Sequence, residues 1–543
     1  MGARPWLKAY GAIPATIDPD RYSSVTALMD AAMVKYADRP AFHSLGRSIT
    51  YAQVDQLSAA FCAYLQHQLG VRKGDRIAVM LPNFAAFPLA MLGIIRAGAV
   101  QVNVNPLYTP RELAHQLRDA GCDTIVIFAG STPTLAEIIG ETPVKNVITV
   151  KPGDGLGLDA PSPPIDARLK QTIAFTDALA AGAPLKRTPV TLTGDDNLYL
   201  QYTGGTTGLS KGATLSHRNL IANTEQFKAL MGDVMTDGQD SVVTAIPLYH
   251  IFALMVNLIS YFSVGAENWL VANPRDMDGF VATLKAARPT VFTGVNTLFQ
   301  GLCMHPGLKE VDWSRGRLCA GGGSAILEPT AKRWQEITGL FIREGFGLSE
   351  TSPIVSLNPP SVNEYTGTTG VPMPSTDVKL IDDDGNEVPE GGSGEICVKG
   401  PQVMSGYWQN PKANEAAFTP DGYFKTGDVG LIDERGFLKI VDRKKDMVIV
   451  SGFNVYPNDV ESVATAIPGV AECACIGVPD DKTGEAVKLF VVRAPGATLT
   501  EQDVIDGCRK GLTAYKVPKY VVFIDALPKS TVGKILRREL RNV

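Results

Sequence analysis

Short apolar runs alternate with apolar segments of helical length over the first part of the chain. Asp75–Leu81, Ala99–Val104 and Asp123–Phe128 have the length and composition of buried strands. Between them, Ala85–Arg96 and a segment around Leu113–Ala120 have the length of helices. Alternation of strand, helix and strand predicts parallel sheets with crossover helices, and therefore an α/β fold.

The later part of the chain has a different pattern. Asp377–Asp382 and Gly394–Lys399 resemble strands joined by tight turns, which predicts a β-rich subdomain. An α+β pattern follows, with predicted helices at Asn458–Ala466 and Glu501–Leu512 and strands at Ala474–Val478 and Val487–Val492. The chain has 543 residues, more than one core supports. We therefore expect a large N-terminal domain of two α/β subdomains plus a β-rich subdomain, and a small mobile α+β C-terminal domain.

Two segments between these elements carry their own predictions. Asp442–Asp446 is a run of charged residues between two apolar strand-like segments, which is typical of a solvated turn. Lys151–Pro164 is rich in Gly and Pro, and we interpret it as an exposed loop rather than a domain boundary.

One segment is apolar enough to require a membrane test. Ala245–Ala266 contains no Asp, Glu, Lys or Arg and is long enough to span a bilayer. It contains Pro247 and His250 and ends against Glu267, which favours a buried helix at the wall of a pocket. Met1–Asp20 lacks the apolar core of a signal peptide.

Charge and cysteine content narrow the class of protein. With 51 basic and 56 acidic residues the net charge is −5, which does not suggest a general nucleic-acid binder. Of the 8 cysteines only Cys473 and Cys475 are close in sequence, and histidines that could complete a metal site are distant. Core thiols in a reducing compartment are the favoured interpretation, and we expect a cytoplasmic protein.

The segment Tyr202–Gly212, YTGGTTGLSKG, has the composition of a phosphate-binding loop. Glycines let the backbone approach an anion closely, and successive N–H groups can then face phosphate oxygens. The threonines add hydroxyl donors and Lys211 adds a charge. The loop is not a Walker A motif, because Lys211 is followed by Gly212 rather than by Ser or Thr. By composition alone, a Gly/Thr-rich surface turn stays the alternative.

Further sequence blocks follow this loop in a fixed order over nearly the whole chain. The blocks are LQYTGGTTGLSKGATLSHRNL at Leu200–Leu220, PLYHIFAL at Pro247–Leu254, GVNTLF at Gly294–Phe299, AGGG at Ala320–Gly323, EGFGLSET at Glu344–Thr351, KTGDVG at Lys425–Gly430, IVDRKKDMVIVSGFNVYP at Ile440–Pro457 and LPKSTVGKILRREL at Leu527–Leu540. This ordered set resembles the adenylate-forming superfamily of acyl-CoA synthetases, luciferases and peptide-synthetase adenylation domains. Within it, the chain is most similar to bacterial long-chain fatty-acid–CoA ligases.

The resemblance implies two half-reactions. A carboxylate attacks the α-phosphate of ATP to give acyl-AMP and pyrophosphate, and the thiol of CoA then takes the acyl group and releases AMP. ATP and CoA would be cosubstrates, with Mg²⁺ as the metal. Other interpretations stay open: a medium-chain or aryl acid ligase, an acyl-AMP ligase, a luciferase-like oxidase or an inactive lipid-binding homologue. A peptide-synthetase domain is disfavoured, since no carrier domain follows the last block before Val543.

The resemblance assigns a nucleotide site to residues of several blocks. These residues are Thr203, Gly204, Gly205, Thr206, Thr207, Gly208, Lys211, Gly322, Gly323, Ser324, Glu344, Gly345, Phe346, Gly347, Ser349, Asp428 and Arg443. Lys534, Glu350 and Thr206 are expected to be catalytic, with Glu350 and Thr206 binding Mg²⁺. Phe346 departs from the tyrosine usual in the family and loses a hydroxyl, whereas Ser349 keeps one. We expect Lys529, Arg537 and Arg538 to form only a basic surface.

The remaining assignments concern the acyl chain, CoA and domain motion. His250, Ile251, Phe252 and Val295 are expected to line the acyl pocket, and Ser451, Gly452 and Phe453 the CoA path. The implied domains are an AMP-binding domain at 1–441, a hinge at 442–445 that includes Asp442 and Lys445, and a C-terminal domain at 446–543. Fatty acid, ATP and CoA are the expected partners. A monomer or homodimer is expected, and peripheral association with the inner face of the membrane stays open.

Overall fold

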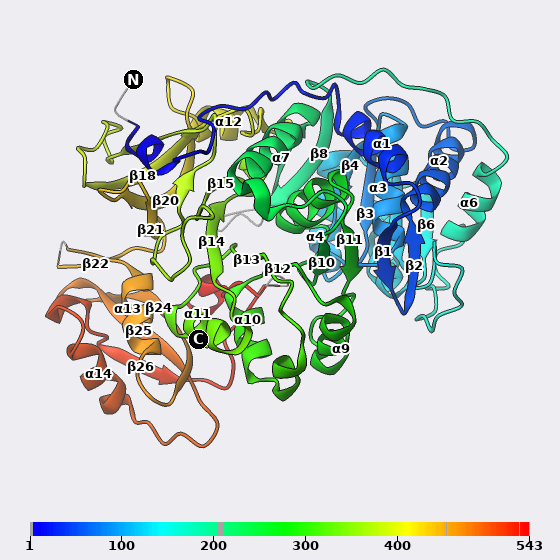
Figure 1. The fold of residues 1–543 in the computed structure, drawn as a ribbon. Helices are drawn as coiled ribbons and strands as arrows, with labels where there is room; N and C mark the ends of the chain where they lie inside the picture. The colour runs from blue at the N-terminus through cyan, green and yellow to red at the C-terminus, as the bar shows by residue number, and fades with distance from the viewer. Residues whose placement is uncertain (1–3, 204–209, 452, 531–532, 542) are drawn as a thin grey trace.

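The computed structural model of the protein describes residues 4–203, 210–451, 453–530, 533–541 and 543. Two large sheets with their helices, a smaller antiparallel sheet and a C-terminal sheet make up the fold (Figure 1). The mixed α/β architecture with a large N-terminal and a small C-terminal domain is therefore confirmed.

The first large sheet is mainly parallel and has the strand order β19-β9-β8-β4-β3-β5-β6-β7. Its strands are β3 (Arg76–Met80), β4 (Val100–Asn103), β5 (Thr124–Phe128), β6 (Asn146–Val150), β7 (Ile173–Ala174), β8 (Asn197–Thr203), β9 (Lys211–Ser216) and β19 (Gly406–Tyr407). Its helices include α2 (Tyr51–His67), α3 (Ala86–Arg96), α4 (Pro110–Ala120), α5 (Thr132–Ile138) and α6 (Phe175–Gly182). The early strands and helices predicted from the apolar pattern are all confirmed.

The second large sheet has the order β16-β15-β14-β13-β12-β10-β11-β1-β2. Its strands are β1 (Pro40–Ser44), β2 (Arg47–Thr50), β10 (Ser241–Thr244), β11 (Glu267–Leu270), β12 (Val291–Gly294), β13 (Leu318–Gly321), β14 (Ile342–Gly347), β15 (Ile354–Leu357) and β16 (Val371–Pro372). Its helices include α1 (Val25–Lys35), α7 (His217–Met231), α9 (Met277–Ala287), α10 (Asn296–Met304) and α11 (Glu328–Thr338). The carboxyl ends of β12 and β13 lead directly into the predicted acyl and nucleotide blocks.

The predicted β-rich subdomain is an antiparallel sheet with the order β17-β18-β20-β21. Its strands are β17 (Asp377–Ile381), β18 (Ser393–Lys399), β20 (Phe424–Ile432) and β21 (Leu438–Arg443), with α12 (Pro411–Ala417) alongside. The end of β21 carries Asp442 and Arg443, so part of the charged run belongs to a strand rather than to a turn.

The C-terminal part has a sheet and core of its own. β22 (Val448–Val450), β23 (Phe453–Val455), β24 (Val470–Asp480), β25 (Gly484–Arg493) and β26 (Tyr520–Phe523) form the sheet, and α13 (Pro457–Thr465), α14 (Glu501–Arg509) and α15 (Arg537–Leu540) pack with it. The predicted helices and strands of this part are confirmed. It is drawn in orange and red below the sheet of β17, β18, β20 and β21, and it lies beside α10 (Figure 1).

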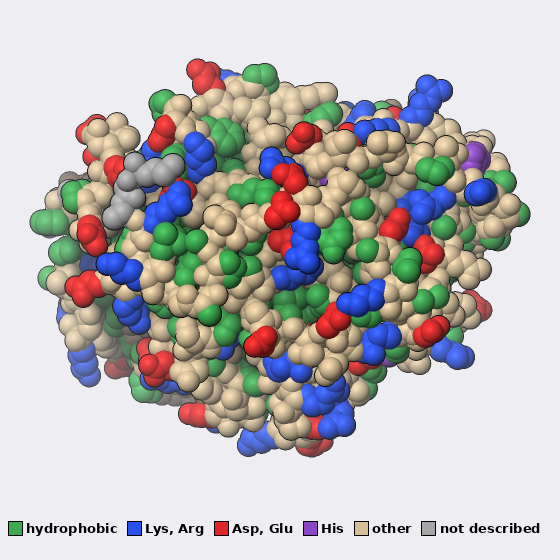
Figure 2. All heavy atoms as spheres, turned by 45° about the horizontal axis from the view of Figure 1, so that its top comes forward, with side chains coloured by type: hydrophobic (Ala, Val, Ile, Leu, Met, Phe, Trp, Pro, Cys, Tyr) green, Lys and Arg blue, Asp and Glu red, His purple; other side chains and the backbone are tan. Residues whose placement is uncertain are grey.

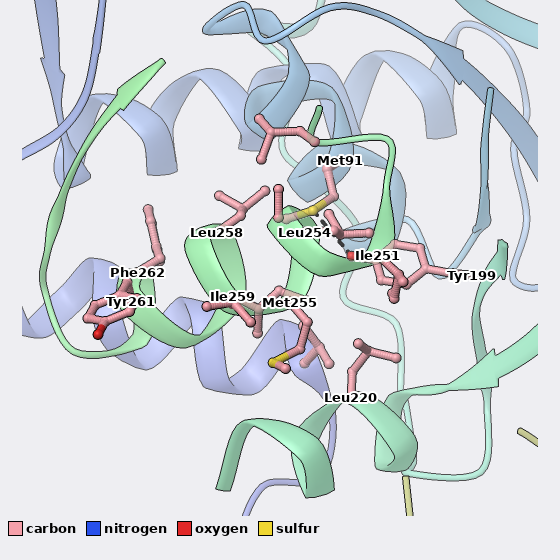
Figure 3. Close-up of a cluster of buried hydrophobic side chains, with 14 of the residues drawn as sticks. Met91, Tyr199, Leu220, Ile251, Leu254, Met255, Leu258, Ile259, Tyr261 and Phe262 are labelled. Carbon is pink, nitrogen blue, oxygen red and sulfur yellow. Dashed lines mark hydrogen bonds between the residues drawn. The ribbon is translucent and has the colours of Figure 1, made fainter. Parts of the chain in front are cut away.

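The central part of the uncharged segment, residues 251–263, is a largely buried helix, as predicted, whereas residues 245–250 form no helix. Ala253–Ser260 is a π-helix that continues into α8 (Tyr261–Ser263), and every residue of the π-helix is buried. Its apolar side chains pack with Met91 of α3 and Tyr199 of β8 (Figure 3). In the part of the chain that the structure describes, no helix is both long and apolar enough to cross a bilayer.

The Gly/Pro-rich segment 151–164 contains no helix or strand, in agreement with the loop prediction. The prediction that it is exposed is only partly correct, because Gly153 and Asp154 are buried. A side chain at Gly155 would collide with Leu89 of α3, with a distance of 2.5 Å between the new Cβ and Leu89 Cδ1. Close packing on α3 therefore fixes one turn of the loop.

Candidate active site

Glycines at the ends of β13 and β14 form a tight wall. A Cβ atom at Gly322 would lie 3.2 Å from the carbonyl oxygen of Gly345 and 3.6 Å from Cε1 of Phe252. Gly323 has φ of +78°, and a Cβ there would meet Cγ1 of Val295 at 3.8 Å. The structure thus brings together predicted nucleotide residues and two of the predicted acyl-pocket residues, and the space between them is limited by backbone.

Glu344 stabilises this wall through hydrogen bonds. Its carboxylate accepts one from the backbone N–H of Ile326 at 3.1 Å, and its carbonyl accepts two from Asn358 at 3.1 and 3.0 Å. Burial raises the pKa of the Glu344 carboxyl to about 8. The residue therefore connects β14 to the segment after Gly323, on which Ser324 also lies.

Glu350 is a buried carboxylate held by a tyrosine that sequence reasoning did not identify. The hydroxyl of Tyr407, on β19, donates to Oε1 of Glu350 at 2.8 Å. Burial raises the pKa of Glu350, and the Tyr407 hydrogen bond opposes that rise. Nζ of Lys211 lies 4.7 Å from the centre of the Tyr407 ring. Tyr407 thus connects the end of the predicted phosphate loop to the predicted metal ligand.

The donor set at Glu350 fits Mg²⁺ rather than a metal held entirely by protein. Among the described residues, no group of three or more His, Cys, Asp or Glu could hold a metal ion. The Glu350 carboxylate is an oxygen ligand with few other protein ligands near it in the described part of the chain. This matches Mg²⁺, which is usually bound through one or two carboxylates plus the phosphates of a substrate. Thr206, the other predicted ligand, lies outside the described residues.

The two ends of the predicted phosphate loop are held by one helix. Thr203 and Lys211 are paired at the ends of β8 and β9. The hydroxyl of Tyr202 donates to Asp119, and Nε2 of His115 lies 2.8 Å from the carbonyl oxygen of Ser210. Asp119 and His115 lie one turn apart on α4, so this helix fixes both ends of the loop.

Some of the predicted site residues are not among those that the structure describes. Gly204, Gly205, Thr206, Thr207 and Gly208 in the phosphate loop, and Gly452 in the predicted CoA loop, are not among the described residues. Their assigned roles stay predictions.

Asp428 and Arg443 face each other across β20 and β21. They are register partners, and Nε of Arg443 lies 3.5 Å from Oδ1 of Asp428. Asp428 is buried, which raises its pKa, while the positive charges of Arg443 and Lys534 lower it. A carboxylate can accept hydrogen bonds from hydroxyl groups, and an adjacent cation can pair with a phosphate attached nearby.

Lys534 reaches this site from the C-terminal domain. Burial lowers the pKa of its ammonium group to about 7, with repulsion from Arg443 adding to the effect and attraction to Asp428 opposing it. Burial, with a smaller contribution from Lys534, lowers the pKa of His250 to about 4. His250 is therefore neutral at pH 7, and Lys534 acts on Asp428, Arg443 and His250 from one position.

The remaining acyl and CoA residues are more dispersed. Ile251 is 1% exposed and packs in the apolar cluster near Tyr199 (Figure 3), whereas Phe252 borders Gly322. In the predicted CoA loop, Phe453 is 57% exposed, and its ring centre lies 4.8 Å from that of Tyr515. Ser451, two residues earlier, has φ of +51°. In this structure Phe453 therefore stacks on Tyr515 within the C-terminal domain.

The predicted hinge and the basic surface are linked by Arg537. Its guanidinium lies 2.8 Å from Oε2 of Glu461 and 3.6 Å from carboxylate oxygens of both Asp442 and Asp446, and its side chain is 16% exposed. The surface prediction is therefore wrong for Arg537, whereas Arg538 is exposed as expected. Lys445 of the predicted hinge is also exposed.

The fold, with its large N-terminal and small C-terminal domains, and the ordered sequence blocks together define an adenylate-forming enzyme. The chain belongs to the AMP-binding enzyme family. The family model of the AMP-binding enzyme matches residues 29–408, and that of the AMP-binding enzyme C-terminal domain matches residues 459–534.

Curated relatives are similar over nearly the full chain. A long-chain-fatty-acid–CoA ligase of Escherichia coli O6:H1 is 48% identical over 550 aligned residues, covering 99% of this chain and 98% of the relative. A long-chain-fatty-acid–CoA ligase of Haemophilus influenzae is 43% identical, covering 97% of this chain and 96% of the relative.

Solved structures show the same architecture. The anthranilate CoA ligase AuaEII in complex with anthranoyl-AMP aligns with a TM-score of 0.87 at 26% identity, covering 98% of each chain. ATP-bound MatB from Rhodopseudomonas palustris aligns with a TM-score of 0.83 at 32% identity, covering 96% of this chain and 98% of MatB. Apo MatB, with the same coverage of both chains, aligns with a lower TM-score of 0.73. The present structure is therefore more similar to the ATP-bound form of that protein.

Proposed function

We propose that this protein is an ATP-dependent long-chain fatty-acid–CoA ligase. A fatty carboxylate attacks the α-phosphate of ATP to form acyl-AMP and pyrophosphate, and the CoA thiol then attacks the acyl carbon, with AMP as the leaving group. The observation that carries the proposal is the electrostatic interaction of Lys534 with Asp428 and Arg443, in a chain 48% identical to a long-chain-fatty-acid–CoA ligase.

In the first half-reaction the protein positions charges rather than moving protons. Lys534 stabilises the negative charge that develops at the α-phosphate, and Asp428 and Arg443 hold the ribose. The glycine wall at Gly322 and Gly323 leaves room for adenine and for the acyl carbonyl. Bound at Glu350, Mg²⁺ would supply positive charge to the phosphates. A fatty carboxylate is ionised at neutral pH, so neutral His250 need not act as a base.

In the second half-reaction the C-terminal domain turns about residues 442–445. Lys534 then leaves the site, and the loop that contains Ser451 and Phe453 comes to it and opens the path for CoA. The exposed position of Phe453 supports this proposal, because an exposed side chain on a turning domain can enter a new contact without repacking of the domain core.

The acyl chain is proposed to enter beside Phe252 and Val295, which border Gly322 and Gly323. The buried π-helix Ala253–Ser260 would then form the apolar wall of the pocket. One methylene group is worth only about 1–3 kcal/mol in such a pocket, so pocket depth decides chain length.

A cytoplasmic location is part of the proposal. The cysteines of the chain are free thiols, and all except Cys303 are buried, which is usual in a reducing compartment. Lys, Arg, Asp and Glu are interspersed over the face drawn in Figure 2. We propose a monomer or homodimer, with any membrane association peripheral.

The test is an assay with a fatty acid and ATP, with and without CoA. Pyrophosphate and acyl-AMP are expected without CoA, and acyl-CoA and AMP with it. Formation of acyl-AMP without any acyl-CoA would rule out the ligase, and a preference for aryl acids over long-chain acids would rule out the proposed substrate.

A further inference from the structure

Helix α10 of the N-terminal domain makes two hydrogen bonds to the C-terminal domain. Oγ1 of Thr297 donates to the carbonyl oxygen of Gly533 at 3.4 Å, and Nε2 of Gln300 donates to the carbonyl oxygen of Ala471 at 3.0 Å. The helix lies beside the red C-terminal segment in Figure 1. Both acceptors are backbone atoms, so the contact depends on the position of the C-terminal chain rather than on one of its side chains.

The approach at Gly533 is too close for a side chain as long as Thr297 keeps its hydroxyl group. Gly533 has φ of +76°, and a Cβ atom there would lie 2.4 Å from Oγ1 of Thr297 and 3.2 Å from Cγ2 of Val295. Glycine is therefore favoured for both conformation and space. Because Lys534 is the next residue, the contact with Thr297 sets the position from which the lysine enters the site.

The two contact points are connected to each other within the C-terminal domain. Nζ of Lys529 lies 2.6 and 2.8 Å from the carboxylate oxygens of Glu472, the residue after Ala471. Lys529 also forms a β-bridge with Ile535, just after Lys534. The strand that meets Gln300 and the segment that meets Thr297 are thereby joined.

On its opposite side α10 is fixed in the N-terminal core. Phe299 is fully buried, and its ring centre lies 5.5 Å from that of Phe292 and 4.9 Å from that of Trp334. Thr297 and Gln300 are only partly buried. The helix therefore offers a rigid face to the C-terminal domain.

We propose that Thr297 and Gln300 are positioning residues that dock the C-terminal domain for acid activation. The inference rests on the proposed function. Both acceptors follow residues 442–445 in the chain and both donors precede them, so rotation at that hinge breaks the two bonds together. The α10 face thus stabilises the arrangement that presents Lys534 and is released for transfer to CoA.

The first test traps the docked arrangement with a disulfide. A Cβ at Gly533 would lie 3.7 Å from Cβ of Thr297, within the range of about 3.5–4.5 Å found in disulfides, so the two new sulfurs can bond. The oxidised T297C/G533C variant should show the cross-link by mass spectrometry. Compared with the same variant in its reduced form, it should form acyl-AMP at an equal or higher rate and lose acyl transfer from preformed acyl-AMP. Reductant should restore transfer. Failure to form the cross-link, or full acyl transfer while cross-linked, would overturn the inference.

The second test removes one donor. Gln300→Leu should slow acyl-AMP formation about three- to tenfold, the usual effect of one lost hydrogen bond, and leave acyl transfer unchanged. Gln335→Leu on α11 is the matched control, because Nε2 of Gln335 donates to the carbonyl of Asn363 within the N-terminal domain. Equal slowing of both half-reactions, or no effect, would contradict a docking role. Absence of both half-reactions in the unmodified protein would instead refute the proposed function, and the cross-link would still test docking.

Discussion

At the scale of single residues, burial decides which groups are charged. The pKa of Lys534 is lowered from 10.5 to about 7, chiefly by burial, so the ammonium form is partly lost near neutral pH before ATP binds. His250, with a pKa of about 4, does not change its charge in that range. Lys534 and Glu344, whose pKa burial raises to about 8, are therefore two site groups expected to change charge near neutral pH, and a variant at Lys534 separates them.

The first prediction concerns pH. At ATP concentrations well below KM, the adenylation rate should fall as pH rises through about 7, because Lys534 loses its proton. Saturating ATP should move this fall to higher pH, because the phosphates favour the charged lysine. Lys534→Arg should lose the dependence, since guanidinium stays protonated. An identical fall in that variant would assign the titration to another group.

The second prediction concerns the same side chain. Lys534→Ala should slow acyl-AMP formation about 100- to 1,000-fold, the usual effect of removing an electrostatic stabiliser of the transition state. Transfer from preformed acyl-AMP to CoA should remain largely intact, because the proposed rotation of the C-terminal domain removes Lys534 from the site. Single-turnover measurements of each half-reaction make the comparison, and equal loss of both would refute the assigned role.

At the scale of elements, a polar network inside the core holds the π-helix. Nδ2 of Asn257 donates to Oγ1 of Thr244 at 2.9 Å, and Oδ1 of Asn257 accepts from Thr293 at 3.0 Å. The carbonyl oxygen of Asn257 accepts from Asn268 at 3.0 Å. The network ties the helix to β10, β11 and β12, which fixes the proposed pocket wall against the sheet.

The third prediction follows from this network. Asn257→Ala should destabilise the N-terminal domain by about 2–3 kcal/mol, because it leaves the buried Thr293 hydroxyl without its acceptor and removes the hydrogen bond to Thr244. Urea unfolding measures the loss. Ser263→Ala is the control, since its hydroxyl bonds only to the Ser260 carbonyl among the hydrogen bonds described, and it should cost about 1 kcal/mol or less. An equal loss of unfolding free energy in the two variants would show that the Asn257 network contributes no more than a single hydrogen bond.

The elements themselves could largely be predicted from sequence. Apolar runs in the sequence predicted strands β3, β4 and β5 and helix α3. This works because the spacing of apolar residues that distinguishes a strand from a helix is visible within a short stretch of sequence. The π-helix could not be predicted, because its geometry depends on partners such as Thr244 and Asn268. Tyr407 and Thr297 were also missed, since a single tyrosine or threonine has no distinctive spacing.

At the scale of the whole molecule, one buried ionic cluster joins the predicted hinge to the C-terminal domain. Arg537 faces Asp442, Asp446 and Glu461, and burial raises the pKa of Asp442 to about 6 while Arg537 opposes that rise. The cluster couples the end of β21 to α13 and α15. Loss of this ionic cluster is therefore expected to destabilise the C-terminal domain more than the two large sheets.

The fourth prediction removes the central cation. Arg537→Met should destabilise the C-terminal domain by about 3–5 kcal/mol at pH 7, because it leaves buried carboxylates unpaired. The loss should be smaller at pH 5, since protonation of Asp442 then removes one of the unpaired charges. Unfolding curves at both pH values provide the measurement. Exposed Arg538→Met should change stability by about 0.5 kcal/mol or less, and a similar loss there would contradict the cluster.

The sequence by itself determined the α/β class, the order of the elements and the blocks that mark an adenylate-forming enzyme. Those features are local, because they depend on residue type and short spacing. Only the tertiary structure decided that Gly533 meets Thr297 across 236 positions of the chain and that Lys534 comes close to Asp428. Burial and neighbouring charge set the proton affinity of a side chain, and both come from segments that only folding brings together.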